Sequence, residues 1–334
     1  MAEDIIRRGA ERLGRRLDWI LLAIVGLLLV CAVLAQPGWS LLAGFWQIQI
    51  SETGLITDPV ATGGLGGALL NAALVLLLSI LLVRWMRLPV TGAAFACLFL
   101  MAGFAMLGKN LLNIAPIVAG GWLHALYKRE SFAKYVYLTL YGTCLSPMVS
   151  FLMVHTRPGL RWLAMALCGL AIGFLLPAIA RFTTRVHQGY NLYNVGFAAG
   201  ILGLGIASVF KGFGVEFVSV GSWSQSGHGL LCGMMVVLLS GLFACGVLLG
   251  CRSPGAYRRV LRHSGRAVAD FIILDGPGIA LVNMALVGSV GLAYLLMLYN
   301  QGVRLNGPLV CCLFAMTGFG AFGKHPRNIL PVMG

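Results

Sequence analysis

Long apolar segments, separated by short polar ones, make up most of the chain. The first runs from Trp19 to Ala35, and most approach the ~20 residues that an α-helix needs to cross a bilayer. Further helices are expected at about 66–86, 90–107, 114–127, 132–154, 159–180, 190–210 and 229–250. The pattern predicts an all-α, polytopic transmembrane helical bundle with about ten spans.

Composition supports a membrane protein and changes how the charge is interpreted. Hydrophobic residues are 59% and charged residues 10% of the chain, and the mean hydropathy is +0.90, whereas soluble domains carry about 25% charged residues. The net charge of +14 does not indicate a nucleic-acid partner, because the arginines cluster at the ends of apolar segments. That distribution is typical of cytoplasmic loops.

Basic residues also predict the orientation. Five arginines precede the first helix and five more lie between residues 251 and 267, whereas the segment from Gln36 to Thr57 has no Lys or Arg. We therefore expect a multi-pass protein of a prokaryotic cytoplasmic (inner) membrane with a cytoplasmic N-terminus. A cleaved signal peptide is the alternative for the first helix. Since Val33-Leu34-Ala35 is a poor cleavage site, we expect the helix to be retained.

One polar motif occurs twice in the chain. The pattern Gly-Lys-x-x-x-Asn-Ile-x-Pro begins at Gly108 and again at Gly323. Upstream of the motif, Asn71 and the four residues after it match Asn283 and the four residues after it. Leu55–Pro59 likewise matches Ile273–Pro277. A duplicated polar motif in a membrane protein is a pointer to a solute pathway.

The duplication suggests a division of the chain into four parts. Residues 1–54 hold the cytoplasmic basic N-terminus, the first helix and an exterior segment, and repeat 1 covers 55–130. Connecting helices and the arginine-rich loop occupy 131–270, and repeat 2 covers 271–334. Repeat 2 lacks the helix that follows the motif in repeat 1, so it is expected to be truncated and the protein to continue beyond Gly334.

The predicted topology makes the repeats inverted. Repeat 1 begins outside after one crossing, and repeat 2 begins inside after the arginine-rich loop, which is the arrangement of inverted-topology repeats. This count includes 114–127 as a crossing. If that segment is only re-entrant, the parity changes and the repeats would be parallel.

Each copy of the motif puts a lysine after a long apolar span, and we expect that lysine to lie within the membrane. Such a residue usually faces a cavity or a partner. Proline removes a backbone donor, and a broken helix is tolerated only where its freed groups meet protein or water. We therefore expect broken or re-entrant helices beside a solute path, with polar groups at Lys109, Asn113, Pro116, Lys324, Asn328 and Pro331. The alternative is a surface loop whose lysine binds lipid headgroups.

Two aspartates and two further asparagines accompany the repeats. Asp58 and Asp275 each precede a Pro-containing helix start, and they could neutralise the motif lysines or cap the following helix. Asn71 and Asn283 lie about two turns inside their helices. They could make interhelical hydrogen bonds or line the solute path.

A third polar site lies between the repeats. His187-Gln188-Gly189-Tyr190-Asn191-Leu192-Tyr193-Asn194 opens an apolar segment. Asn191 and Asn194 could begin a re-entrant half-helix whose N-terminus favours an anion or a carbonyl dipole. An ordinary N-cap followed by a packing helix is the alternative.

These motifs resemble those of a known family. The two Gly-Lys-x-x-x-Asn-Ile-x-Pro copies, with the His187–Asn194 segment between them, resemble a family of prokaryotic polytopic membrane proteins known as a domain of unknown function. A remoter similarity is to urea transporters, whose two inverted halves line a pore. Gly67–Val75 and Asn113-Ile114-Ala115-Pro116 carry that similarity. The lysines and the missing Phe-Asn order depart from a urea pore, so the similarity does not imply urea as the solute.

The sequence favours a channel or secondary transporter for a small polar solute, neutral or anionic, at the interface of the two repeats. We expect partners to be the lipid bilayer and the solute, with a homo-oligomer possible through small-residue helix faces. No P-loop, metal-spaced His/Cys cluster or hydrolase motif occurs, so we expect no cofactor, no metal and no enzymatic activity. The alternatives are a membrane-embedded enzyme with an aspartate pair, and a structural or sensory subunit.

Overall fold

The computed structural model describes residues 2–52, 57–215, 223–251, 253–265 and 267–333. Seven helices in this part of the chain are long and apolar enough to cross a membrane: Leu13–Ala35, Pro59–Trp85, Val136–His155, Arg161–Val186, Asn194–Gly212, His228–Leu248 and Pro277–Met297. The all-α prediction holds for the described residues, apart from one isolated β-bridge between Asp270 and Phe322. The chain is a helical multi-pass membrane protein, and the number of about ten spans stays a prediction.

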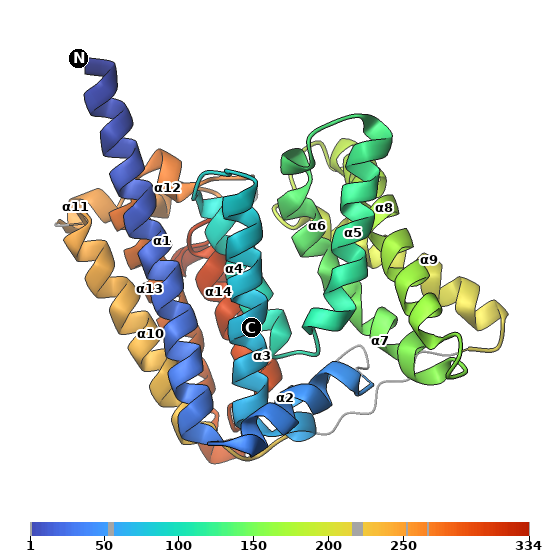
Figure 1. Cartoon of the computed structure of the whole chain (residues 1–334). Helices are drawn as coiled ribbons and strands as arrows, with labels where there is room; N and C mark the ends of the chain where they lie inside the picture. The colour runs from blue at the N-terminus through green and yellow to red at the C-terminus, as the bar shows by residue number, and fades with distance from the viewer. Residues whose placement is uncertain (1, 53–56, 216–222, 252, 266, 334) are drawn as a thin grey trace.

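The helices form two groups that stand side by side (Figure 1). The first group encloses the larger hydrophobic core and consists of α1 (Ala2–Ala35), α3 (Pro59–Trp85), α4 (Gly92–Ala105), α10 (His228–Leu248), α13 (Pro277–Met297) and α14 (Gly307–Phe319). The second group encloses a smaller core and consists of α5 (Leu111–Lys128), α6 (Val136–Gly142), α7 (Ser146–His155), α8 (Arg161–Val186) and α9 (Asn194–Gly212). Helix α5 contributes Ile114 to the larger core and Ile117 to the smaller one.

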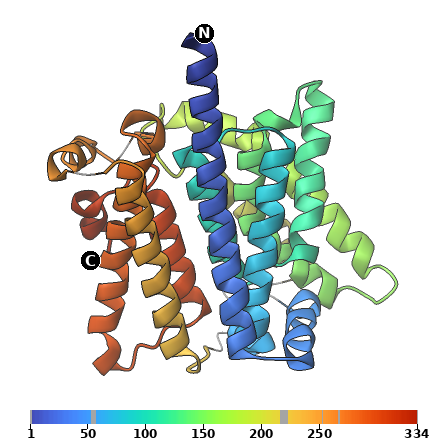
Figure 2. The same ribbon diagram turned by 60° about the vertical axis from the view of Figure 1, so that its left-hand side comes forward.

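Short helices lie at the two ends of these groups. Helix α2 (Trp39–Ile50) lies across one end, which we call the α2 end (Figure 1). The opposite end, called the α12 end, holds α11 (Pro254–Tyr257), η3 (Val260–Arg262) and α12 (Phe271–Leu274), and the N-terminal part of α1 extends beyond it (Figure 2). The other short elements are η1 (Phe132–Lys134), η2 (Thr143–Leu145), η4 (Tyr299–Gln301) and α15 (Pro326–Met333).

Helices α4 and α5 enter the bundle from the α12 end and return to it. Trp122 of α5 packs against Trp85 at the end of α3, with ring centres 6.4 Å apart. The Tyr137 hydroxyl donates to Pro89 O in the α3–α4 loop. Helices α11 and η3, which belong to the arginine-rich segment, lie at the same end as the N-terminal part of α1 (Figure 2). The inverted arrangement of the repeats stays a prediction.

Helices α4 and α14 lie antiparallel at the centre of the first group. A Cβ on Gly92 would overlap Ala321 O, and one on Gly307 would overlap Met106 O, so each helix begins where the other ends. Phe99 and Phe314 meet between them with ring centres 5.6 Å apart. At 14 and 13 residues they are about 20 Å long, shorter than the ~30 Å hydrocarbon core. Neither helix alone spans a membrane.

Close packing of α5 on α8 leads to a stability prediction. A Cβ on Gly173 would overlap the carbonyl of Ile117, so Gly173→Leu must push two helices apart. We expect it to lower the free energy of unfolding by about 3 kcal/mol or more, measured by thermal unfolding in detergent. Gly200→Leu on α9 is the control, because a Cβ there meets nothing within 4 Å. Equal melting temperatures for the two variants would contradict the packing argument.

Candidate functional site

The first lysine motif forms a turn between α4 and α5. Gly108 has a φ of 112°, which favours glycine, and Lys109 N donates to Phe104 O (3.0 Å). Asn110 and Asn113 then form a reciprocal capping box: Asn110 N donates to Asn113 Oδ1, and Asn113 N to Asn110 Oδ1, both at 2.9 Å. The Asn113 amide also donates to Gly108 O (3.0 Å). Asn113 therefore satisfies backbone groups that the turn leaves without helical partners.

The second motif forms the same turn between α14 and α15. Gly323 has a φ of 88°, and Lys324 N donates to Phe319 O (3.0 Å). His325 N donates to Asn328 Oδ1 (2.9 Å), and Asn328 Nδ2 donates to Gly323 O (3.1 Å). The duplicated sequence thus makes a duplicated local structure, because both copies keep the glycine and the asparagine that hold the turn.

The motif prolines do not break the chain, which corrects the predicted cause of the helix breaks. Pro116 lies inside α5 and Pro331 inside α15. The chain is broken before these helices, at the turns around Gly108 and Gly323. A proline removes only one backbone donor, and α5 continues through it.

Asn71 and Asn283 tie each turn to a long helix. Asn71 Nδ2 donates to Ala105 O (3.2 Å) and Lys109 O (2.8 Å). The Ala105 carbonyl is left without an intrahelical partner at the C-terminus of α4, and Lys109 lies in the turn before α5. Gln49 of α2 donates to Asn71 Oδ1 (3.0 Å). Asn71 is fully buried, which agrees with the interhelical interpretation.

Asn283 makes the equivalent contacts in the second half. Its Nδ2 donates to Gly320 O (2.6 Å) and Lys324 O (2.7 Å). The Tyr257 hydroxyl donates to Asn283 Oδ1 (2.8 Å). It takes the place of Gln49, which donates to Asn71 Oδ1 in the first half. Both predicted asparagines are therefore committed to holding the lysine turns in place.

Asp58 connects three segments near the α2 end. Its Oδ1 accepts from Val60 N (3.0 Å) in the first turn of α3 and from Gly307 N (3.2 Å) at the start of α14. Its Oδ2 accepts from Ser224 N (2.8 Å). The predicted capping role is confirmed, and the carboxylate also caps the short helix of the other half.

Asp270, which the sequence interpretation overlooked, makes the corresponding contacts at the α12 end. Its Oδ1 accepts from Gly92 N (2.9 Å) at the start of α4 and from Ile272 N and Ile273 N (3.1 Å each) in α12, and its Oδ2 from Ala93 N (3.1 Å). A sequence signal exists: Asp270 precedes Asn283 by the same number of residues as Asp58 precedes Asn71.

Asp275 is therefore not the structural counterpart of Asp58, which corrects the alignment of Ile273–Pro277 with Leu55–Pro59. Asp275 Oδ2 lies 3.4 Å from His263 Nε2, and Oδ1 lies 3.8 Å from Arg259 Nε. Helix α13, 21 residues and about 30 Å long, begins beside Asp275 and ends toward the α2 end, where Asp58 lies. The two carboxylates do not form a pair.

Neither motif lysine has a carboxylate partner within the described residues, which corrects the proposed Asp–Lys pairing. Lys109 is 3% exposed; its Nζ donates to Met101 Sδ (3.3 Å) and lies 5.1 Å from the Phe104 ring centre. Lys324 is 7% exposed; its Nζ donates to Gly265 O (3.3 Å) and lies 5.4 Å from the Tyr193 ring centre. Buried cations without an anion are costly and mark functional sites.

One cavity brings the predicted polar sites together. It has a volume of about 360 Å³ and lies between α4, α6, the end of α14 and residues 191–196. Phe104 and Phe319, each five residues before a motif lysine, line it, together with Tyr193. The two ammonium groups therefore stack on Phe104 and Tyr193, aromatic side chains of the cavity wall. Repetition of a Phe before each Gly-Lys pair was the sequence signal for this wall.

Asn191 and Asn194 also line this cavity. Asn191 Oδ1 accepts from Tyr193 N (2.9 Å). Asn194 begins α9, and its Oδ1 accepts from Thr183 Oγ1 and His187 Nε2, both at 2.7 Å. Asn194 thus anchors α9 to α8, and Asn191 holds the loop that forms one cavity wall.

The family model described as "Protein of unknown function (DUF1576)" matches residues 39–212 and 252–334. The chain belongs to this family. The match includes both lysine turns, both asparagines that hold them and the residues that line the cavity. Comparison with curated proteins and with solved structures found no match, so the similarity to urea transporters stays a prediction.

Within the family match, the first segment begins at Trp39, the first residue of α2. The second begins shortly before α11. Helices α2 and α11 supply Gln49 and Tyr257, the two residues that hydrogen-bond the buried asparagines. The matched segments therefore contain each lysine turn together with all of its side-chain support.

Proposed function

We propose that the two halves are inverted repeats that extend further than the duplicated motif. The support is the reciprocal capping, in which Asp58 reaches the start of α14 and Asp270 reaches the start of α4. The left-handed residues Gly64 and Gly276 also precede Asn71 and Asn283 by equal spacing. In this proposal α1 to α5 form one repeat, and α10 to α15 form the other.

We further propose that the protein is a channel or secondary transporter for a small polar solute, neutral or anionic. The observation that carries the proposal is that two buried lysines, neither with a carboxylate partner among the described residues, lie over aromatic side chains that line one cavity. Such ammonium groups favour a solute that offers lone pairs or negative charge. The basic α12 end would face the cytoplasm of a prokaryotic inner membrane.

Solute flux into proteoliposomes tests this function. The panel would contain small amides, polyols, carboxylates and inorganic anions. We expect one class to cross faster than in protein-free liposomes, and Lys109→Met and Lys324→Met to lower that flux about tenfold or more, the factor for a loss of ~1.4 kcal/mol. Methionine keeps an apolar stem of similar length and removes the charge.

The matched control is Lys128→Met, which removes an exposed lysine from the end of α5 and should leave the flux unchanged. No flux of any solute, with folded and correctly oriented protein, would contradict transport and favour a structural or sensory subunit. An enzyme using Asp58 and Asp275 as a dyad is the weaker alternative, since the two carboxylates lie near opposite ends of α13.

A further inference from the structure

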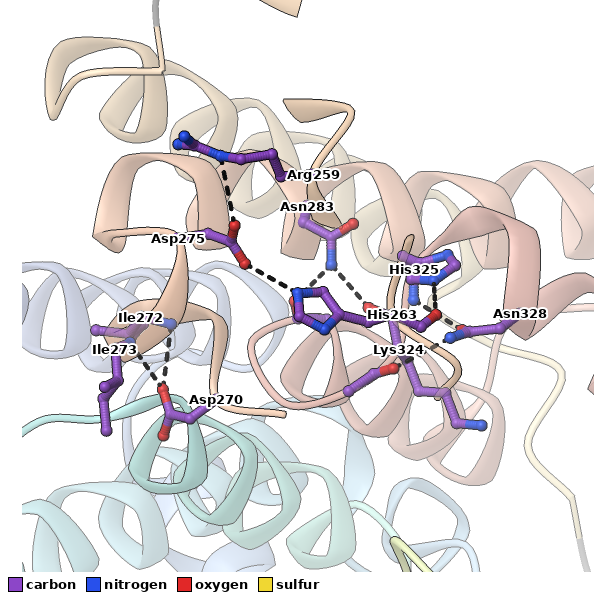
Figure 3. Close-up of polar contacts among 12 residues, drawn as sticks. Arg259, His263, Asp270, Ile272, Ile273, Asp275, Asn283, Lys324, His325 and Asn328 are labelled. Atoms are coloured by element: carbon purple, nitrogen blue, oxygen red, sulfur yellow. Dashed lines mark hydrogen bonds and ion pairs between the residues drawn. The ribbon is translucent and has the colours of Figure 1, made fainter. Parts of the chain in front are cut away.

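The two lysine turns differ in whether their supporting groups can bind a proton. In the first turn, Asn110 Nδ2 donates to Ile48 O (3.0 Å). In the second, the same position holds a histidine, whose Nε2 lies 2.8 Å from His263 O (Figure 3). A titratable ring therefore replaces an amide in the same structural role.

The hydrogen bond of His325 determines its tautomer. A carbonyl oxygen only accepts, so Nε2 must carry the hydrogen and donate it to His263 O. In the neutral ring, Nδ1 is then an unprotonated acceptor. His325 is 2% exposed, and this Nδ1 is buried and has no hydrogen-bond partner among the described residues. His325 Nδ1 is therefore a buried nitrogen with a free lone pair that can accept a proton.

The His263 residue whose carbonyl oxygen His325 contacts also packs its ring against a carboxylate, and that carboxylate contacts an arginine. Asp275 Oδ2 contacts the His263 ring at 3.4 Å, and Asp275 Oδ1 lies 3.8 Å from Arg259 Nε. In Figure 3 the carboxylate, the His263 ring and the His325 ring follow one another across the site. The Asp275 side chain is only 5% exposed, and its Oδ2 makes no hydrogen bond within the described part of the chain.

The surrounding charges explain how a proton and an anion would reinforce each other. Lys324 and Arg327 flank His325 in its own segment, Arg259 and His263 come from the α11–η3 side, and Asp275 is the acid at this site. Burial of the ring, and then the excess of positive charge around it, lower the pKa of His325 and disfavour a second proton. An anionic group placed beside Lys324 would offset the contribution of the positive charges, and by linkage a proton on His325 would then favour the anion.

We infer that His325 Nδ1 is a proton-binding site that couples proton movement to movement of an anionic solute past Lys324. Asp275 and His263 hold the segment that encloses it. The inference rests on the proposed transport function and assigns the coupling ion to it. Repeat 1 has the neutral Asn110 at this position, so coupling would reside in one half only.

His325→Asn is the decisive variant, because asparagine already makes the corresponding contact in the first turn and should preserve the fold. The full chain would be reconstituted and tested for accumulation of a transported anion under a pH gradient. Since one pH unit is a tenfold ratio of proton activity, we expect up to about tenfold accumulation per coupled proton. In His325→Asn we expect equilibration without accumulation, and in the control His155→Asn, a half-exposed histidine, accumulation as in the wild type.

Nitrogen NMR of ¹⁵N-histidine-labelled protein in liposomes tests proton binding without any solute. We expect a buried ring with hydrogen on Nε2 that takes up a proton as the pH falls, and whose signal is lost in His325→Asn. A His325 signal that never changes protonation, or accumulation that persists in His325→Asn, would overturn the inference. Flux that ignores the pH gradient would overturn it while leaving transport intact. Absence of all flux, with the NMR titration present, would instead contradict the proposed transport function.

Discussion

Asp270→Ala is expected to lower the free energy of unfolding by about 4 kcal/mol or more, counting ~1 kcal/mol for each lost capping-type hydrogen bond. Four backbone N–H groups lose their acceptor, two at the start of α4 and two in α12. Because these groups belong to different halves of the chain, the loss also frees α4 from its neighbour. Thermal or denaturant unfolding in detergent, followed by tryptophan fluorescence, measures the effect.

Asp58→Ala and Asp275→Ala are the matched comparisons, because they test whether Asp270 or Asp275 corresponds to Asp58. Asp58 accepts three backbone N–H groups in the corresponding place, so its loss should cost a similar amount. Asp275 contacts Arg259 and His263 only through side chains, and its loss should cost clearly less. A larger effect for Asp275→Ala than for Asp270→Ala would contradict the assigned correspondence of Asp58 with Asp270.

Asn71→Leu is expected to cost about 3 kcal/mol or more, taking at least ~1 kcal/mol for each of three buried polar groups left without a partner. The substitution keeps the side-chain size but leaves the carbonyls of Ala105 and Lys109 and the amide of Gln49 unsatisfied. Unfolding in detergent measures this loss. The same substitution at Asn283 should give a similar value, since it also serves two carbonyls and one donor.

Two controls distinguish the stability lost with these hydrogen bonds from the effect of replacing an asparagine in general. Asn300→Leu changes an exposed residue of η4 and should alter stability little. The single variant Gln49→Leu removes the hydrogen bond to Asn71 and the acceptor of Leu111 N but keeps both carbonyl contacts of Asn71, so it should cost less than Asn71→Leu. If Asn71→Leu is as stable as Asn300→Leu, the buried asparagine does not hold the turn.

Helix positions were predictable where apolar length alone decides them. The helices expected at about 190–210 and 229–250 appear as α9 and α10, with ends within about four residues of the expected ones. The segment at 132–154 was expected as one helix but is divided into η1, α6, η2 and α7. Hydrophobicity does not report where a chain bends around its neighbours, so the division was not visible in the apolar pattern.

The sequence predicted which residues belong to the candidate site better than it predicted which groups those residues contact. Lys109, Lys324 and the asparagines were singled out by repetition, and the structure places them at two equivalent turns. The aspartates were wrongly matched to the lysines, because opposite charge is a general attraction that does not specify a position. The backbone N–H groups that Asp58 and Asp270 bind carry no signature in the sequence, since almost every residue has one.

By itself, the sequence determined the membrane class, most helix positions, the family and the duplicated lysine motif. These follow from local quantities: apolar length, charge at segment ends and repeated residues. Only the tertiary structure decided that α4 and α14 lie antiparallel, that Asp270 corresponds to Asp58, and that both lysines lie over aromatic residues of one cavity wall, with no carboxylate partner in the described part of the chain. The physical reason is that a polar group is satisfied by whatever donor or acceptor the packing brings within reach, often the backbone of a distant segment.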